Sequence, residues 1–278
     1  SAFITGFTIV ALSTSLPELF IGIAAALDKT PVISLGTVIG SNIADLTLVA
    51  GIAILATGGI KIPRRHIKHD VLFMILIMLF PIILSVLGKQ LSQIDGGILV
   101  LTFVIYWYHL ITKTKNHILT ESISRISIIG YTLLFVASII TLYIAADYAV
   151  FYGTQFGLAI GLPALFVGLF FLAIGTSLPE LIFETSAMVK GLPEFAIGDI
   201  VGSVVTNATL VLGITALIAP IDLQKTLFLT AAGFMVVAAI LFSTFIDASN
   251  KLTKAEGITL ILFYVLFTIT EFTIKGVI

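Results

Sequence analysis

The chain has 278 residues, of which 59% are hydrophobic and only 10% are charged, and its mean hydropathy is +1.19. Because a soluble domain carries roughly 25% charged residues, this chain lacks the polar residues needed to cover a globule in water. A net charge of -1 provides no basic field for a nucleic acid, and the absence of cysteine excludes disulfides and thiolate metal sites. The composition therefore predicts an integral membrane protein.

Long apolar stretches indicate membrane-spanning helices, since a helix needs about 20 apolar residues to cross a hydrocarbon core of about 30 Å. Nine stretches qualify or nearly so, namely Ala2–Leu27, Pro31–Thr57, Val71–Leu87, Gly97–Thr112, Ile126–Ala149, Leu162–Val189, Leu192–Ala219, Leu227–Phe245 and Gly257–Thr273. They are too long and too uniformly apolar for β-barrel strands, which have about 10 alternating residues. The sequence therefore predicts an all-α integral membrane protein without a sizeable soluble domain.

The loops differ in their Lys and Arg content, which predicts the orientation because positive residues concentrate on the cytoplasmic side. Ten basic residues lie in one set of alternate loops, namely Lys61, Arg64, Arg65, Lys68, Lys113, Lys115, Arg125, Lys190, Lys251 and Lys254. The other set holds four, namely Lys29, Lys89, Lys225 and Lys275. We therefore expect a multi-pass protein of the plasma membrane, with Ser1 cytoplasmic and Ile278 outside.

One stretch of sequence occurs twice. The segment Ala11-Leu-Ser-Thr-Ser-Leu-Pro-Glu-Leu19 recurs as Ala173-Ile-Gly-Thr-Ser-Leu-Pro-Glu-Leu181, at an offset of 162 residues. The register continues without a gap over residues 11–52 and 173–214, with 17 identities in 42 aligned positions. Such a match through Pro, Glu and Ser indicates internal duplication. Because an odd number of predicted helices separates equivalent points, the second copy should be inverted in the membrane, as in many secondary transporters.

The duplication also predicts how the chain is organised. Residues 1–112 form the first repeat, residues 113–125 a cytoplasmic linker, and residues 126–278 the second, inverted repeat. The helix predicted at 126–149 precedes the second copy, whereas no equivalent helix precedes the first. The natural protein is therefore expected to have one more helix before Ser1, which would give ten helices in two sets of five.

Acidic residues lie inside the predicted helices without basic partners. Among them are Glu18, Asp45, Glu180, Glu184 and Asp199, whereas every Lys and Arg lies in a loop or at a helix end. Charges inside a membrane are costly and are functional by default. These carboxyl groups should therefore be either protonated or neutralised by bound cations, and oxygen ligands suit hard ions such as Ca²⁺ and Na⁺.

Two prolines bring further oxygen atoms close to these acids. Pro17 and Pro179 lack the N–H that would bond the carbonyls of Ser13 and Gly175, so each helix should be kinked or broken there. Polar pairs at i, i+4 follow in the next helices and share one helix face. The hydroxyls beside the prolines are Thr14, Ser15, Thr176 and Ser177, and the pairs are Ser41 with Asp45 and Ser203 with Asn207. Two such sets related by a pseudo-twofold axis would enclose one site near mid-membrane.

These residues resemble the α-repeats of the sodium/calcium exchanger family, of prokaryotic type, within the calcium/cation antiporter superfamily. The resemblance rests on both Thr-Ser-Leu-Pro-Glu cores, both Gly-Ser turns and the polar residue four positions later. It implies a compact bundle of ten helices whose broken helices hold the ions. Carried over by position, the metal ligands would be Glu18, Glu180, Asp45, Asn207, Thr14, Ser15, Thr176, Ser177, Ser41 and Ser203, with the carbonyls of Ala11 and Ala173.

The sequence departs from the family pattern at several positions. Asp45 and Asn207 exchange the Asn that is usual in the first repeat and the Asp that is usual in the second, and Ser13 replaces a glycine. Glu184 adds a further acid, so Glu184 and Asp199 are possible accessory ligands. Asp199 lies nearer to a helix end, and the sequence leaves open whether it lines a vestibule or a hydrated mouth.

The leading interpretation is a secondary active antiporter that exchanges Na⁺ for Ca²⁺ by alternating access. Ca²⁺ and Na⁺ would be transported ions rather than cofactors, no organic cofactor or catalytic residue is expected, and the lipid bilayer is the predicted partner. A Ca²⁺/H⁺ exchanger or a K⁺-dependent exchanger is the nearest alternative, and Glu184 favours such additional coupling. A cation channel is the alternative from a different class.

Overall fold

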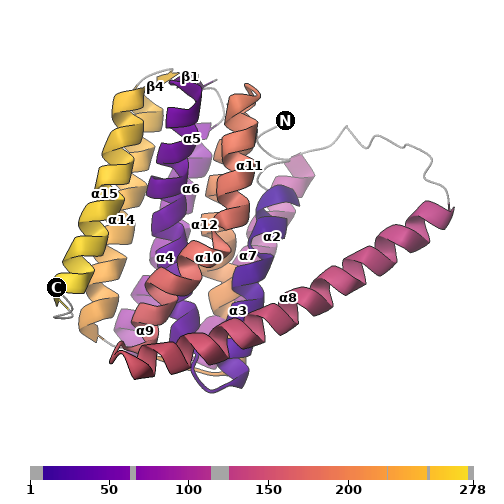
Figure 1. The fold of residues 1–278 in the computed structure, drawn as a ribbon, viewed down its shortest axis with the longest axis vertical. Coiled ribbons are helices and arrows are strands. Elements are labelled where there is room, and N and C mark those ends of the chain that lie inside the picture. Colours follow the sequence, from indigo (N-terminus) through magenta and orange to yellow (C-terminus); the bar gives the residue numbers. More distant parts are fainter. Residues whose placement is uncertain (1–8, 63–66, 114–124, 224, 249–250, 275–278) are drawn as a thin grey trace.

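The computed structural model describes residues 9–62, 67–113, 125–223, 225–248 and 251–274, which form a bundle of helices crossed obliquely by one long helix (Figure 1). Several residues on which the predicted orientation rests lie outside these ranges, namely Arg64, Arg65, Lys115 and Lys275, with the termini Ser1 and Ile278. Most of the predicted linker 113–125 also lies outside them. The orientation and the linker therefore stay predictions.

The first half of the chain consists of helices with two short strands between them. In order, the elements are α2 (Ala11–Thr14), α3 (Leu16–Leu27), α4 (Val32–Ala44), the π-helical turn η2 (Asp45–Val49), α5 (Ala50–Thr57), β1 (Ile60–Lys61), α6 (Ile67–Gly88), β2 (Gln90–Leu91) and α7 (Gln93–Lys113).

The second half begins with the long helix α8 (Arg125–Ala159) and then repeats the order of the first half. Its further elements are α9 (Ala164–Phe166), the π-helical turn η3 (Val167–Leu172), α10 (Ala173–Thr176), α11 (Leu178–Val189), α12 (Pro193–Thr206), the π-helical turn η4 (Asn207–Val211), α13 (Leu212–Ile218), β3 (Ile221–Asp222), α14 (Lys225–Ala248), β4 (Lys251–Leu252) and α15 (Lys254–Ile274).

The length and composition of the helices fit a membrane bundle. Within the described residues, 7 helices are long and apolar enough to cross a membrane, and a bent pair, Ala164–Thr176 with Leu178–Val189, makes up to 8. Ala11–Leu27 forms a shorter apolar helix. The all-α membrane class is thus confirmed, while the count of nine spans stays a prediction.

The helices break where the two prolines predict. Pro17 and Pro179 are each the second residue of a helix, α3 or α11, a position at which a missing N–H costs nothing. The residues just before these helices, Ser15 and Ser177, leave the helical conformation, with ψ angles of 1° and 5°. In the second copy the two pieces meet at a bend of 42°.

The largest difference from the predicted bounds is at the end of one helix. The helix expected to end at Ala149 continues to Ala159 as α8. Gly161 follows the end of the helix, with a φ of +71° that allows the Leu162 N–H to bond the carbonyl of Gly157 at 2.8 Å. A left-handed glycine is a common helix terminator, whereas the length of a membrane span, on which the predicted bound rests, does not locate it.

Two short β-ladders join the two halves of the chain. β1 pairs antiparallel with β4, which places Lys61 beside Lys251, and β2 pairs with β3, which places Gln90 beside Asp222. Lys61 and Lys251 belong to the same predicted side, so the β1–β4 ladder agrees with that grouping.

The helices α4–η2–α5 and α12–η4–α13 lie at the centre of the bundle. In each of these spans 83% of the most apolar 18-residue stretch is buried, against 11–39% in the other five full-length spans. The backbones approach closely because glycines face them, and a Cβ on Gly40 would lie 2.1 Å from the carbonyl oxygen of Leu169. In Figure 1, α2 and α3 run in the opposite direction to α10 and α11 around this centre.

Candidate cation-binding site

The predicted polar side chains converge on the two central helices. Each of these residues is buried, with at most 9% of its surface exposed. They are Thr14, Ser15, Glu18, Ser41, Asp45, Thr176, Ser177, Glu180, Ser203 and Asn207. Buried polar groups in an apolar bundle are costly unless they have partners, so their concentration in one region needs a chemical explanation.

Hydroxyl groups from the two copies of the repeat meet each other. Ser41 Oγ in α4 lies 3.2 Å from Thr176 Oγ1 at the break before α11. Thr14 Oγ1, at the break before α3, lies 3.3 Å from Ser203 Oγ in α12. Each break therefore contacts the central helix of the other copy, and the equivalent contact occurs in both directions.

The two glutamates lie in the first turns of α3 and α11. Glu18 Oε1 accepts a hydrogen bond from Ser41 Oγ at 3.2 Å. Glu180 interacts electrostatically with Glu18, Asp45 and Asp199. Free N–H groups and the helix dipole favour a carboxylate at a helix N-terminus, so the break positions each glutamate as well as exposing polar backbone. We term Glu18, Glu180, Asp45 and the four contacting hydroxyls the central cage.

Many oxygen atoms in this region have no hydrogen-bond partner among the described residues. They are Ser15 Oγ, Glu18 Oε2, Ser177 Oγ, Asp199 Oδ2, Asn207 Oδ1 and both carboxyl oxygens of Asp45, Glu180 and Glu184. The described buried polar residues include no Lys, Arg or His. Buried polar atoms without partners are rare in proteins, and an oxygen set of this kind is chemically suited to a hard cation such as Ca²⁺ or Na⁺.

The carboxyl groups would not hold an ion by themselves. Within the described residues, no three acidic or histidine side chains approach closely enough to coordinate one metal ion. Hydroxyl and carbonyl oxygens would therefore have to complete a ligand set. The carbonyls of Ala11 and Ala173 each accept bonds from the threonine hydroxyl and the serine N–H of their own turn. The carbonyl of Ala173 also lies 3.5 Å from Ser41 Oγ and so borders the central cage.

Asp45 and Asn207 each begin a π-helical turn, η2 and η4. Such turns widen the helix and occur frequently at functional sites. Asn207 Nδ2 donates to Asn42 Oδ1 at 3.2 Å, and Asn42 Nδ2 lies 3.7 Å from Met235 Sδ. The site predicted from the sequence does not include Asn42, because that prediction rests on polar residues at equivalent positions and the repeat counterpart of Asn42 is Val204. Its position beside Ser41 was the available signal.

The two possible accessory acids are also buried. Glu184 and Asp199 are both 0% exposed, so the hydrated mouth considered for Asp199 is wrong. Asp199 Oδ1 accepts a hydrogen bond from Thr14 Oγ1 at 3.3 Å. The reason is tertiary, since α12 packs against both α2 and α11 and is covered close to its end. Glu184 interacts electrostatically with Asp199, Asp45 and Glu180.

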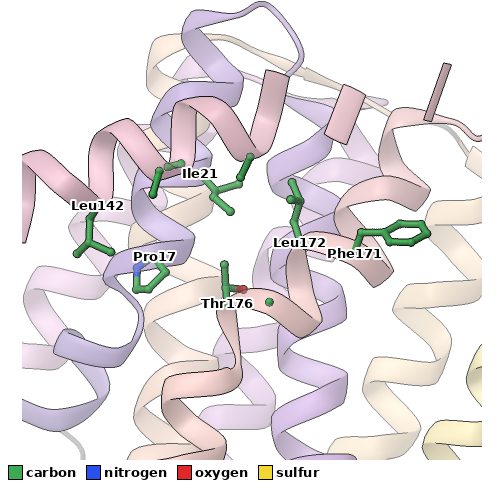
Figure 2. Close-up of a pocket in the computed structure, with 10 residues that line it drawn as sticks. Pro17, Ile21, Leu142, Phe171, Leu172 and Thr176 are labelled. Carbon is green, nitrogen blue, oxygen red and sulfur yellow. The ribbon is translucent and has the colours of Figure 1, made fainter. Parts of the chain in front are cut away.

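A cavity of about 210 Å³ lies between α8 and the two broken helices. Figure 2 shows Pro17 and Ile21 of α3, Leu142 of α8 and Leu172 of η3 around it, with Thr176 beside Pro17. Most of the lining is apolar, but Pro17 and Thr176 belong to the two breaks. The cavity therefore reaches the edge of the central cage.

Comparison with known proteins agrees with this site. The family model described as "Sodium/calcium exchanger protein" matches residues 1–112 and 130–273. The sodium/calcium exchanger MaX1 of Methanosarcina acetivorans is 28% identical over 99% of this chain and 90% of its own length. The inner membrane protein YrbG of Escherichia coli is 30% identical over 86% of this chain and 77% of its own length.

The fold agrees as well. A solved structure of the sodium-calcium exchanger NCX_Mj, soaked with Na⁺ and Sr²⁺, superposes with a TM-score of 0.71 at 24% identity, covering 96% of this chain and 86% of that one. The family-model match spans most of the chain, which is enough to assign the family. This chain therefore belongs to the sodium/calcium exchanger family, and it is a membrane antiporter that transports ions rather than an enzyme.

Proposed function

We propose that the chain exchanges Na⁺ for Ca²⁺ across the membrane by alternating access to the central cage. The observation that carries this proposal is the reciprocal contact of Thr14 with Ser203 and of Ser41 with Thr176, which gathers oxygens of both copies around Glu18. No base is described among the buried polar residues to balance the carboxylates, so transported cations are the chemically suitable counter-charges.

Exchange follows from charge balance in such a cage. Glu18, Glu180 and Asp45 together carry up to three negative charges, which several Na⁺ ions or, in part, one Ca²⁺ would neutralise. Because like charges repel strongly in a low-dielectric pocket, the two kinds of ion would occupy the cage alternately. This mutual exclusion couples the two fluxes without any covalent chemistry.

Alternating access is proposed to use the two repeats, residues 1–112 and 126–278, as inverted halves. This proposal is supported by the equivalent order of elements in the two repeats and by the opposite directions of α2–α3 and α10–α11. In this arrangement each break would face one side of the membrane in turn. We further propose that the end of the bundle with Lys61 and Lys251 is cytoplasmic and that the protein resides in the plasma membrane.

A second candidate is exchange that also uses H⁺ or K⁺. Glu184 is the observation that favours it, because its two carboxyl oxygens are buried next to the cage without hydrogen-bond partners among the described residues. An additional acid increases the positive charge that the site can take up. A cation channel, the third possibility, would not require an opposing ion.

Calcium uptake into proteoliposomes tests the proposal. The purified protein is reconstituted, and uptake of radiolabelled Ca²⁺ is compared under outward Na⁺, K⁺ or H⁺ gradients at clamped membrane potential. The proposal predicts uptake driven by Na⁺ at fixed pH. Uptake that follows only H⁺ or K⁺ would favour the second candidate, and uptake without any opposing ion would indicate a channel.

A further inference from the structure

The hairpin α11–α12 carries a second layer of polar residues beyond the central cage. In the equivalent hairpin α3–α4, Glu18 lies opposite Ser41 and accepts its hydrogen bond. The counterparts of that pair are Glu180 and Ser203. Glu184 lies one helical turn beyond Glu180 in α11, and Asp199 lies one turn before Ser203 in α12. Both acids are therefore one layer closer to the connection between α11 and α12.

Both acids of this layer are fully buried and lack partners for most of their oxygens. Glu184 and Asp199 are 0% exposed. Both oxygens of Glu184 and Oδ2 of Asp199 have no hydrogen-bond partner among the described residues. The two groups also interact electrostatically. Two like charges cannot be buried together without compensation, and the buried polar residues described include no base.

Thr14 connects this layer with the central cage. Its hydroxyl lies 3.3 Å from Asp199 Oδ1 and also 3.3 Å from Ser203 Oγ. One hydroxyl therefore borders both groups of oxygens. An ion leaving the layer would reach the cage without crossing an apolar barrier at this point.

The layer is absent from the equivalent hairpin of the first copy. There Glu184 corresponds to Gly22, and Asp199 corresponds to Thr37. Gly22 leaves no room for a side chain, since a Cβ would lie 2.5 Å from Thr215 Oγ1. Thr37 donates its hydroxyl to the carbonyl of Ile33 in its own helix at 3.0 Å. The second layer thus belongs to one half of the molecule and is not explained by the duplication.

We infer that Glu184, Asp199 and Thr14 form a second subsite for a hard divalent cation, adjoining the central cage on the side of the α11–α12 connection. Two carboxylates balance the charge of one Ca²⁺, and the threonine hydroxyl supplies a third oxygen ligand. The subsite holds an ion that enters or leaves the cage from that end. This inference rests on the proposed function, because it assumes that the cage itself takes Ca²⁺.

Equilibrium binding of radiolabelled Ca²⁺ to the purified chain in Na⁺-free detergent solution tests the subsite. The wild-type chain should bind two Ca²⁺ ions. Glu184→Gln and Asp199→Asn should each bind one, because each halves the negative charge of the subsite while keeping the size of the side chain. Glu271→Gln is the control, since Glu271 is also 0% exposed but lies in α15, outside both groups, and it should still bind two.

The outcomes separate the subsite from the cage. A wild-type chain that binds a single Ca²⁺, lost in Glu180→Gln, overturns the subsite and leaves the proposed function standing. Two ions retained in both Glu184→Gln and Asp199→Asn overturn the subsite as well. If instead Glu180→Gln and Glu18→Gln bind both ions as the wild type does, the proposed cage is wrong. The wild-type stoichiometry decides the matter even if a variant fails to fold.

Discussion

Glu18 and Glu180 owe their positions to the residue before them. A proline in the first turn ends the preceding helix and starts a new one, so the next residue lies at a helix N-terminus deep in the bundle. There the carboxylate is favoured by the helix dipole but has no basic partner among the described buried residues. A bound cation is the group that we propose to complete the site.

Neutralising either glutamate should therefore abolish transport. Glu18→Gln and Glu180→Gln keep the shape of the side chain and remove one charge from the cage. Loss of one partner of a buried ionic interaction costs about 3–5 kcal/mol, which lowers Ca²⁺ affinity far more than tenfold. Na⁺-driven Ca²⁺ flux in proteoliposomes measures the effect, with Glu271→Gln as the variant that should retain flux. Flux at the wild-type level in all three variants would exclude the two glutamates as ligands.

The exchanged pair Asp45 and Asn207 allows a test of charge against position. Asp45→Asn removes one carboxylate and should weaken the Na⁺ dependence of Ca²⁺ flux more than Ca²⁺ binding, because several monovalent ions need every compensating charge. Adding Asn207→Asp restores the charge, and Asn42 can turn its amide to donate to the new carboxylate. The double variant should recover much of the lost Na⁺ dependence.

Flux is measured against Na⁺ concentration at one pH for both variants. A single variant with unchanged Na⁺ dependence would mean that Asp45 carries no charge in the working site. A double variant as impaired as the single one would mean that the positions are not equivalent.

Much of the site was predictable residue by residue, because duplication marks the same side chains twice. Glu18, Thr14 and Ser41 were identified in this way and are buried together. Asn42 was not predicted to belong to the site, because only one copy of the repeat carries it. The burial of Asp199 was not predictable, because the sequence gives only the position of a residue along its helix. The contact of α2 with α12, which covers Asp199, depends on tertiary packing.

At the scale of elements, the site depends on how closely two helices approach. The backbone of α4 contacts α9 and η3 at glycines, and a Cβ on Gly36 would lie 2.2 Å from the carbonyl oxygen of Leu165 in α9. This approach brings Ser41 within reach of Thr176. The breaks in the helices were predictable from proline, but the partner of each glycine was not, because it lies in the other half of the chain.

Widening this helix contact should disable the site. Gly40→Ala places a methyl group 2.1 Å from the carbonyl oxygen of Leu169, so α4 and η3 must separate, at a cost of roughly 1–3 kcal/mol. Ca²⁺ flux should fall together with the melting temperature in detergent. Gly233→Ala in α14 is the control, since nothing lies within 4 Å of its Cβ position, and it should be neutral or stabilising. A fully active Gly40→Ala protein would argue against this dependence.

For the whole molecule, the account requires two halves that contribute to one site. The β1–β4 and β2–β3 ladders and the reciprocal contacts of α2 with α12 and of α10 with α4 join the halves at both ends and at the centre. The sequence predicted the duplication and the membrane bundle. The contacts between the two copies could not be derived from the sequence, because the spacing of residues along the chain gives no distance between helices that are far apart in sequence.

Competition between the two ions at equilibrium tests the central claim most directly. Radiolabelled Ca²⁺ is bound to the purified wild-type chain, and Na⁺ is added at constant ionic strength and pH. The account predicts that Na⁺ displaces the Ca²⁺ whose binding requires Glu180, with a dependence steeper than first order because several Na⁺ ions replace one Ca²⁺. If the Ca²⁺ that requires Glu180 stays bound at saturating Na⁺, the account is contradicted, since the two ions would then occupy separate sites.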